Sequence, residues 1–191
     1  DARRAQCAAN LKALGEASEL PPSLRLAYSA WSSRTDSEEW CRASDGNVIW
    51  RTPGGPGVWS GLGDFRTGAA ALPQRLAEAT DRPVYMEGLR PPWAVLAVLA
   101  SRPPRADGYV PRTWVVQADP REALDGLALA DLSAFAPCVR LCVGPEASHE
   151  LGEHLRRGAR YDIAGPAMSL GSVGTRCSPP LIDVVSYAEA S

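Results

Sequence analysis

The sequence predicts an α/β domain with a mixed, mostly parallel sheet flanked by helices, preceded by a less regular N-terminal third rich in tryptophan and glycine. Short apolar runs alternate with helical patterns from about residue 82 to residue 163, and repeated strand–helix–strand units imply parallel strands with helices packed on the faces. The chain has 191 residues, of which 45% are hydrophobic and 22% charged, as in an average globular domain. Four of the six tryptophans fall within the first 60 residues.

The chain begins with two expected helices and a polar segment. Apolar residues at helical spacing predict a helix over Ala2–Ser18, which ends before Pro21 and Pro22. A second, shorter helix is expected over Ser23–Ser32, with Ser23 as its N-cap. The polar residues of Asp36–Arg42 predict a helical turn or loop.

A strand, a glycine-rich loop and a helix are expected next. Asn47–Arg51 is a short apolar run that predicts a strand. Gly54–Gly63 holds five glycines and a proline, which predicts an irregular loop. The apolar face of Ala69–Thr80 predicts a helix. The glycine-rich loop lacks the spacing of the known phosphate-binding loops, so we interpret it as a flexible or partner-contact loop.

The second half is more regular. Apolar runs bounded by turn residues predict strands at Arg82–Glu87, Thr113–Gln117, Pro137–Gly144, Ala159–Ile163 and Ile182–Tyr187. Helical patterns predict an apolar helix over Trp93–Ser101, a helix or turn over Ala123–Leu132, and a helix over Glu146–Gly158 that Gly158 suits as a C-terminal cap.

We expect residues 1–191 to form a single domain, with a weak subdivision near residues 54–63. Because the first residue is Asp1, we expect the chain to be a piece excised from a longer protein. Lys12 is the only lysine beside nineteen arginines. Arginine belongs to GC-rich codons, so this bias indicates a GC-rich genome, such as that of a high-GC bacterium or a large DNA virus.

Charge and hydropathy argue against two classes of partner, although nucleic acid is not excluded. The net charge is −2, so a general nucleic-acid binder, which needs a basic face, is not expected. The longest nearly uncharged apolar run, Pro91–Ser101, is too short for the roughly 20 residues that a membrane-spanning helix needs. We therefore expect no membrane partner.

The five cysteines favour a reducing compartment. An odd count does not suit a secreted disulfide framework, so we expect an intracellular protein; secretion with removal of a signal peptide is the alternative. No Cys-x-x-Cys pair occurs, and no metal or cofactor is expected.

Four titratable residues are weak catalytic candidates. Glu87 and Asp119 each follow an expected strand, and ligands of open parallel sheets bind beyond the carboxyl ends of the strands. They would form an acid–base pair if their strands are neighbours. His149 and His154 lie on the expected helix that follows. The alternatives are a helix-capping turn for Asp119 and a solvated helix face for the two histidines.

The candidate binding residues lie in the N-terminal third and just beyond it. Tryptophan and arginine are enriched at binding hot spots. The predicted contact surface comprises Trp31, Trp40, Trp59, Arg51 and Arg66. A local cluster of packed tryptophans is the alternative.

The sequence leaves three functional hypotheses. The first is a non-enzymatic interaction or assembly domain that binds another protein, a further copy of itself included. The second is a small α/β hydrolase or nuclease-like enzyme acting at the carboxyl ends of its strands. The third is a structural component of a capsid, tegument or filament.

Overall fold

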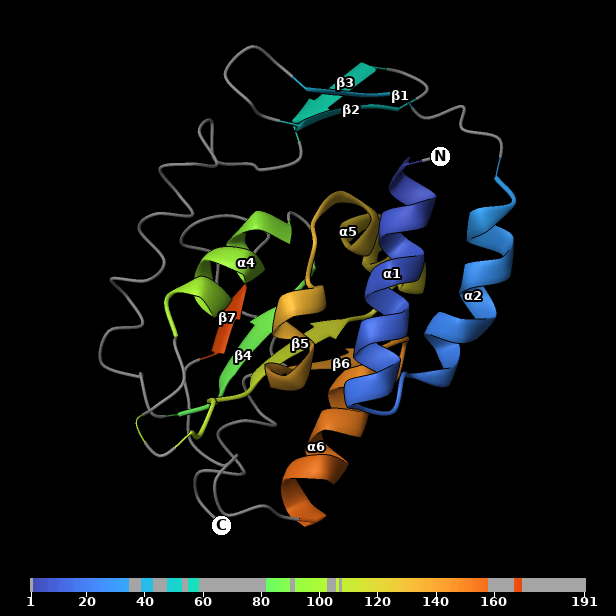
Figure 1. Ribbon diagram of the computed structural model, residues 1–191. Coiled ribbons are helices and arrows are strands. Elements are labelled where there is room, and N and C mark those ends of the chain that lie inside the picture. The colour runs from blue at the N-terminus through green and yellow to red at the C-terminus, as the bar shows by residue number, and fades with distance from the viewer. Residues whose placement is uncertain are drawn as a thin grey trace.

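A four-stranded parallel sheet forms the centre of the computed structural model (Figure 1). Its strands are β4 (Val84–Glu87), β5 (Thr113–Gln117), β6 (Val139–Val143) and β7 (Ala167–Ser169), and they lie in the order β6-β5-β4-β7. Every neighbouring pair is parallel. The prediction of an α/β fold with a mostly parallel sheet flanked by helices is confirmed.

The structure describes residues 2–34, 39–42, 48–52, 55–58, 82–89, 92–102, 106, 108–157 and 167–169. For residues 39–42, 48–52, 55–58 and 167–169 it describes the backbone alone. Several expectations lie outside these residues: the helix over Ala69–Thr80, the strands Ala159–Ile163 and Ile182–Tyr187, and the capping role of Gly158. The short strand β7 was not predicted.

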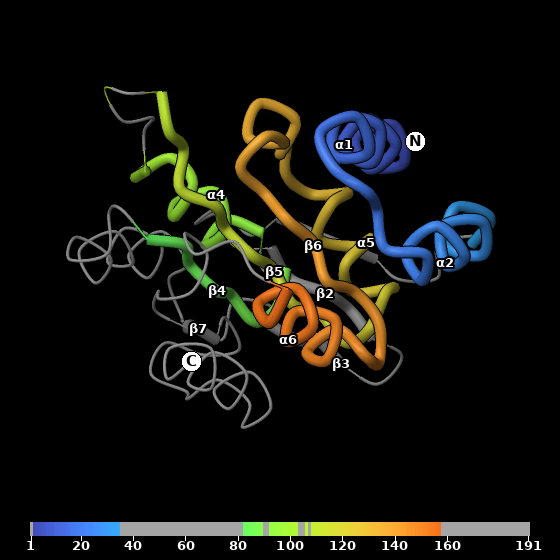
Figure 2. The backbone as a smooth tube through the Cα atoms, turned by 90° about the horizontal axis from the view of Figure 1, so that it is seen from below, coloured from blue at the N-terminus to red at the C-terminus, as the bar shows by residue number. Residues whose placement is uncertain are grey.

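Helices cover both faces of the parallel sheet. The main face carries α4 (Pro92–Ala100), α5 (Pro120–Leu129) and the 3₁₀ helix η2 (Ser133–Cys138), with α1 (Ala2–Ala17) and α2 (Pro22–Ser32) packed on α5. The opposite face carries α6 (Ala147–Arg157). Figure 2 shows the sheet between α6 and the other helices.

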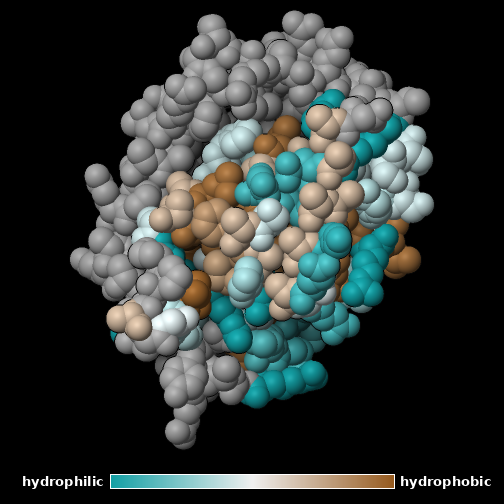
Figure 3. Space-filling view, viewed as in Figure 1, coloured by the Kyte–Doolittle hydropathy of each residue, from teal (hydrophilic) through white to brown (hydrophobic). Residues whose placement is uncertain are grey.

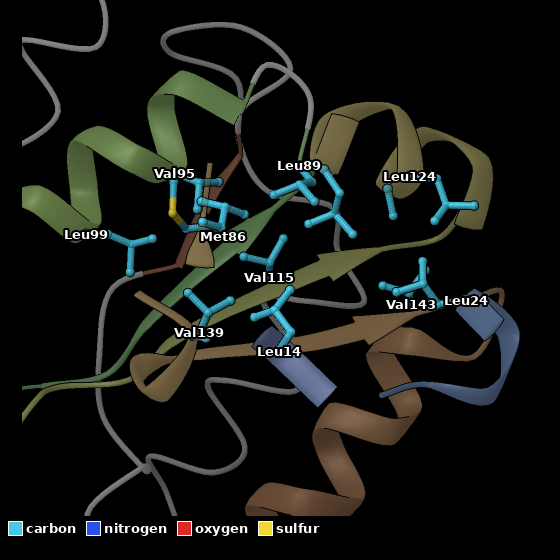
Figure 4. Close-up of a cluster of buried hydrophobic side chains, with 14 of the residues drawn as sticks. Leu14, Leu24, Met86, Leu89, Val95, Leu99, Val115, Leu124, Val139 and Val143 are labelled. Carbon is cyan, nitrogen blue, oxygen red and sulfur yellow. The ribbon is translucent and has the colours of Figure 1, made fainter. Parts of the chain in front are cut away.

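Two hydrophobic clusters hold these layers together, because side chains alternate between the two faces of each strand. On the main face, Met86, Val115 and Val139 point toward Leu14 of α1 and Val95 of α4 (Figure 4). On the other face, a smaller cluster joins β4, β5 and β6 to α6; it consists of Tyr85, Trp114, Val116, Cys142, Ala147, Leu151 and Leu155.

Asn10 fixes α1 to the end of α5. Its side chain is fully buried, and Nδ2 donates hydrogen bonds to the carbonyls of Leu127 and Ala130, each at 2.7 Å. Oδ1 accepts a hydrogen bond from the backbone N–H of Leu132 at 2.9 Å. The last carbonyls of a helix have no partner within the helix, so Asn10 acts as a cap for α5 supplied by another helix.

Helix α2 starts one residue earlier than expected, and Ser23 is not its N-cap. Pro21 occupies the cap position without a side-chain hydrogen bond, and Pro22 is the first helical residue. The fixed φ of proline suits that position. The Ser23 hydroxyl instead donates to the carbonyl of Val143, at the end of β6, and thereby joins α2 to the sheet.

A separate three-stranded antiparallel sheet follows α2. It consists of β1 (Glu39–Arg42), β2 (Val48–Thr52) and β3 (Gly55–Val58), in that order. The strand expected over residues 47–51 is confirmed within one residue. The expectations of a helical turn or loop over Asp36–Arg42 and of an irregular loop throughout Gly54–Gly63 were wrong where β1 and β3 lie.

Pairing with β2 explains both errors. Trp40 lies opposite Trp50, and Trp50 also lies opposite Gly57. Polar and glycine-rich segments have little strand propensity of their own, but ladder hydrogen bonds to a neighbouring strand override that preference. Pro56 is tolerated because β3 is an edge strand.

Arg102 is a buried cation at the amino ends of β4 and β5. Only 6% of the residue is exposed. Its guanidinium donates to the carbonyl of Arg82, to the carbonyl of Arg112 at 3.2 Å and to Oγ1 of Thr113 at 3.3 Å. Burial lowers the pKa of Arg102 below its ordinary value. These acceptors all precede or begin a strand, so Arg102 holds the two strand entries together.

Candidate functional site

The carboxyl edge of the parallel sheet contains a switch point in strand order. The strand order reverses between β4 and β7, since β5 and β6 lie on one side of β4 and β7 lies on the other. Open α/β sheets bind their ligands at such a switch point, outside the carboxyl ends of the strands. Because β4 pairs with β5, the sequence candidates Glu87 and Asp119 follow neighbouring strands at this edge.

Asp119 caps helix α5. Its backbone is extended, and its Oδ1 accepts a hydrogen bond from the N–H of Arg121 at 2.8 Å. That bond satisfies one of the free N–H groups at the start of a helix. The residue is exposed, and Glu87 is half-buried at the last position of β4.

Gln117 bridges the same edge and was not singled out by the sequence analysis. Its Oε1 accepts a hydrogen bond from the backbone N–H of Leu89 at 3.0 Å. Its Nε2 donates to Oε2 of Glu122 at 2.9 Å. Only 8% of Gln117 is exposed. The sequence feature that could have indicated this role is a polar residue at the last position of an otherwise apolar strand. In the structure its amide reaches the turn after the neighbouring strand.

After β4 the structure describes Gly88 and Leu89, and Leu89 packs against α5. Gly88 has a φ of +97°, which glycine adopts without strain, and Leu89 after it is fully buried. The Leu89 carbonyl lies against α5, where a Cβ on Gly126 would approach it to 2.4 Å. In dinucleotide-binding sheets this turn is rich in glycine and open to phosphate. Here the described part of the turn holds one glycine, Gly88, followed by buried Leu89, whose N–H is bonded to Gln117.

The two histidine candidates lie on α6, on the other face of the sheet. His149 is exposed in the first turn of the helix. The ring of His154 lies against the indole of Trp114, with centroids 4.4 Å apart. Trp114 comes three residues before the end of β5, about 10 Å along the strand. The structure does not bring His154 to the strand-end carboxylates.

The described thiols are buried core residues. Cys7, Cys138 and Cys142 are free and buried. Burial, with a smaller contribution from the charge of Asp125, raises the pKa of Cys7 to about 12. Burial, with the charge of Glu150, raises the pKa of Cys142 to about 12, and burial raises the pKa of Cys138. Since the thiolate is the nucleophile, these thiols are poor candidates for covalent catalysis.

The raised pKa values of these thiols predict that the protein becomes less stable at high pH. We expect the free energy of unfolding to fall as pH rises from about 9 towards 12. Over that range the unfolded chain gives up thiol protons that the folded chain retains on Cys7 and Cys142. Urea denaturation across this range measures the effect. Replacing both cysteines by alanine should remove that part of the pH dependence, and an unchanged profile would contradict the prediction.

The tryptophan surface expected from the sequence is only partly described. Trp31 is half-buried on α2; its Nε1 donates to Oδ1 of Asp125 on α5 at 2.9 Å, and its ring stacks on Tyr28 with centroids 6.0 Å apart. It joins α2 to α5. Trp40 and Arg51 lie on adjacent strands, β1 and β2, and their side chains are outside the described residues. Trp59 and Arg66 also lie outside them.

A groove with a mostly apolar lining and two cations lies between α1 and α2. Its volume is about 370 Å³, within the range of about 300–1,000 Å³ seen for ligand pockets. Six residues line it: Ala8, Leu11, Lys12, Leu20, Arg25 and Tyr28. We call it the α1–α2 groove. Figure 1 shows the two helices side by side, and hydrophobic and hydrophilic side chains lie next to one another over them in Figure 3.

Two features are absent from the described residues, a membrane-spanning helix and a metal-binding cluster. None of the helices in these parts of the chain is long and apolar enough to cross a bilayer. Within the same ranges, no three His, Cys, Asp or Glu residues lie close enough together to hold a metal ion.

Comparison with known proteins supports the fold. No protein-family model matches the chain, and no curated protein matches it in sequence. Among solved structures, the chain is similar to a Maf glycosyltransferase from Magnetospirillum magneticum AMB-1, with a TM-score of 0.59 and 14% sequence identity. The match covers 97% of this chain and 35% of the glycosyltransferase chain, so this chain spans about a third of its neighbour's length. At that identity the likeness establishes the α/β fold.

Proposed function

We propose that this chain is a non-enzymatic interaction domain that binds another protein through the α1–α2 groove. The groove itself is the observation that carries the proposal, because it leaves an apolar lining accessible after the two helices have packed on α5. This surface lies on the first two helices, one of which, α2, carries Trp31; the surface expected at Trp40, Trp59, Arg51 and Arg66 stays a prediction, since those side chains lie outside the described residues.

The setting we propose is a reducing, intracellular compartment. The three cysteines whose side chains are described are free thiols in the core, which suits a protein kept among reduced thiols. The similarity to one third of a longer glycosyltransferase is compatible with a domain that works as part of a larger protein. A second copy of this chain is the alternative partner, as expected of an assembly component.

Photo-crosslinking tests this proposal. We expect a p-benzoylphenylalanine placed at Tyr28 to give a protein adduct of defined mass in native extract. The matched control places the same group at His149, which is exposed on the opposite face of the sheet, and should give no such adduct. Leu11→Glu should abolish the Tyr28 adduct while circular dichroism stays native. An adduct of twice 20.3 kDa would identify a second copy, and equal labelling from both positions would contradict the proposal.

A ligand-binding or catalytic domain is the second candidate. It is favoured by the reversal of strand order next to Glu87 and Asp119, and the solved structure it resembles is named a glycosyltransferase. Thermal denaturation with UDP-glucose, GDP-mannose or a CMP-sugar separates the two candidates. A ligand at a hundred times its Kd raises the melting temperature by about 5 °C or more. The interaction domain predicts no shift.

A further inference from the structure

We infer that the partner segment that enters the α1–α2 groove is an acidic amphipathic helix. This inference rests on the proposed function and names the chemistry of the partner. It follows from the shape of the groove, from the partly exposed apolar side chains that line it, and from two cations at its sides.

The shape comes from two helices and a short connection. Helix α1 ends at Ala17 and α2 begins at Pro22, so the two run antiparallel side by side (Figures 1 and 2). Both pack on α5, and α2 is tied to it by the hydrogen bond from Trp31 to Asp125. The groove lies where the two helices meet their connection, and residues 8–12 of α1, Leu20, and residues 25–28 of α2 border it. Amphipathic helices bind in grooves of this kind.

The apolar lining lies at the edge of the core: Leu20 belongs to the core cluster, and Leu11 and Tyr28 pack against it while remaining partly exposed. Leu14 and Leu24 face the core and are fully buried. Leu11 and Tyr28 are one turn away on the same helices and remain half-buried, while Ala8 is exposed and small. A partner helix with apolar side chains at i, i+3 or i+4, and i+7 would cover this strip, since those positions share one face.

The charge of the groove selects the partner. Lys12, the only lysine of the chain, comes from α1, and Arg25 comes from α2. Both are exposed. Neither forms an ion pair or side-chain hydrogen bond with any described residue, although Glu16 lies one turn from Lys12. A partner with carboxylates beside its apolar face would meet both cations, which favours association with acidic over basic sequences.

Two designed peptides test the inference. Both are helical and carry leucines at i, i+3, i+4 and i+7; one has glutamates at the flanking positions and the other lysines. We expect fluorescence anisotropy to show binding of the glutamate peptide to the full chain and at least tenfold weaker binding of the lysine peptide. The double variant K12E/R25E should reverse that preference. Leu11→Glu should weaken both peptides.

The matched control is R156E/R157E, which makes the same charge change on α6, on the opposite face of the sheet. It should leave the preference unchanged, and circular dichroism verifies that each variant is folded. Equal binding of the two peptides, or no binding of either, would overturn the inference. Binding of laurate with no peptide binding would also overturn it and would indicate a small anionic amphiphile. If the Tyr28 crosslink persists while the glutamate peptide fails, the interaction function stands and only the partner chemistry is wrong.

Discussion

Asn10→Leu should lower the free energy of unfolding by about 2–4 kcal/mol, the largest effect that we expect from a single substitution. Leucine has the same branching and number of heavy atoms as asparagine, but it is larger and cannot form its hydrogen bonds. The substitution leaves the carbonyls of Leu127 and Ala130 and the N–H of Leu132 without the partners they have now. A buried polar group that loses its partner costs about 1–3 kcal/mol. Partial entry of water at the end of α5 would reduce the sum for three such groups.

The reason for so large an effect lies in the position of Asn10. Helix α5 ends at Leu129, and Ala130 after it is extended, so the last carbonyls of α5 face away from any continuing helix. Asn10 comes from α1, 117 residues before Leu127, and is fully buried. One side chain therefore caps α5 and attaches the N-terminal helix to it.

Equilibrium urea denaturation measures this effect. Glu16→Leu is the control on the same helix, because Glu16 is exposed and its replacement should change the free energy by less than about 0.5 kcal/mol. If Asn10→Leu changed it no more than Glu16→Leu does, the cap would have no energetic role. Asn10→Ala should resemble Asn10→Leu, since both remove the same hydrogen bonds.

Gly126→Ala should destabilise the protein by about 2–3 kcal/mol, although alanine is the better helix former by about 1 kcal/mol. A Cβ at this position would lie 2.4 Å from the carbonyl oxygen of Leu89 and 2.9 Å from its Cγ. The nearest of these atoms belongs to backbone, which cannot rotate away. Relief of the clash requires α5 to separate from the β4–α4 turn.

Gly15→Ala is a matched control for this substitution. Gly15 is also helical, but its added Cβ would meet only the side chain of Leu20, at 3.3 Å from Cδ1. A small side-chain movement accommodates that contact, so we expect no loss of stability and a gain of up to about 1 kcal/mol. Thermal and urea denaturation compare the two variants. Equal effects of the two substitutions would show that the approach of Leu89 to α5 is unimportant.

Amide hydrogen exchange adds a local measurement. The Leu89 N–H donates to Gln117, and displacement of Leu89 by Gly126→Ala should break that bond. We expect faster exchange at Leu89 in this variant than in Gly15→Ala. Unchanged exchange would mean that the turn stays closed when α5 moves.

Local pattern was sufficient for the regular half of the chain. The strand at Thr113–Gln117 was predicted to the residue, because a short apolar run ends at a helix-capping Asp-Pro pair. The helix expected over Glu146–Gly158 is present as Ala147–Arg157. Leu151 and Leu155 are four residues apart, so both lie on its buried face. The edge position of Glu87 and Asp119 also followed from the sequence.

Contacts between segments far apart in the chain could not be predicted from the sequence. In the sequence, Gln117 is only the last residue of a strand. Its hydrogen bond with the N–H of Leu89 forms only because the turn after β4 packs beside it. In the sequence, Gly126 is only a residue of low helix propensity. Its role in letting Leu89 pack closely against α5 is visible only in the structure. Trp31, which resembles a contact residue in a polar segment, donates instead to an aspartate 94 positions away.

The sequence by itself determined the alternation of strands and helices, because apolar spacing, and the prolines and glycines that end each element, act over a few residues. Tertiary structure alone decided the strand order β6-β5-β4-β7, the pairing that turns residues 39–42 and 55–58 into strands, and the groove between α1 and α2. The physical reason is the range of the interactions. Hydrophobic periodicity is local, whereas a cap such as Asn10 or a groove flanked by Lys12 and Arg25 exists only after separate segments have packed together.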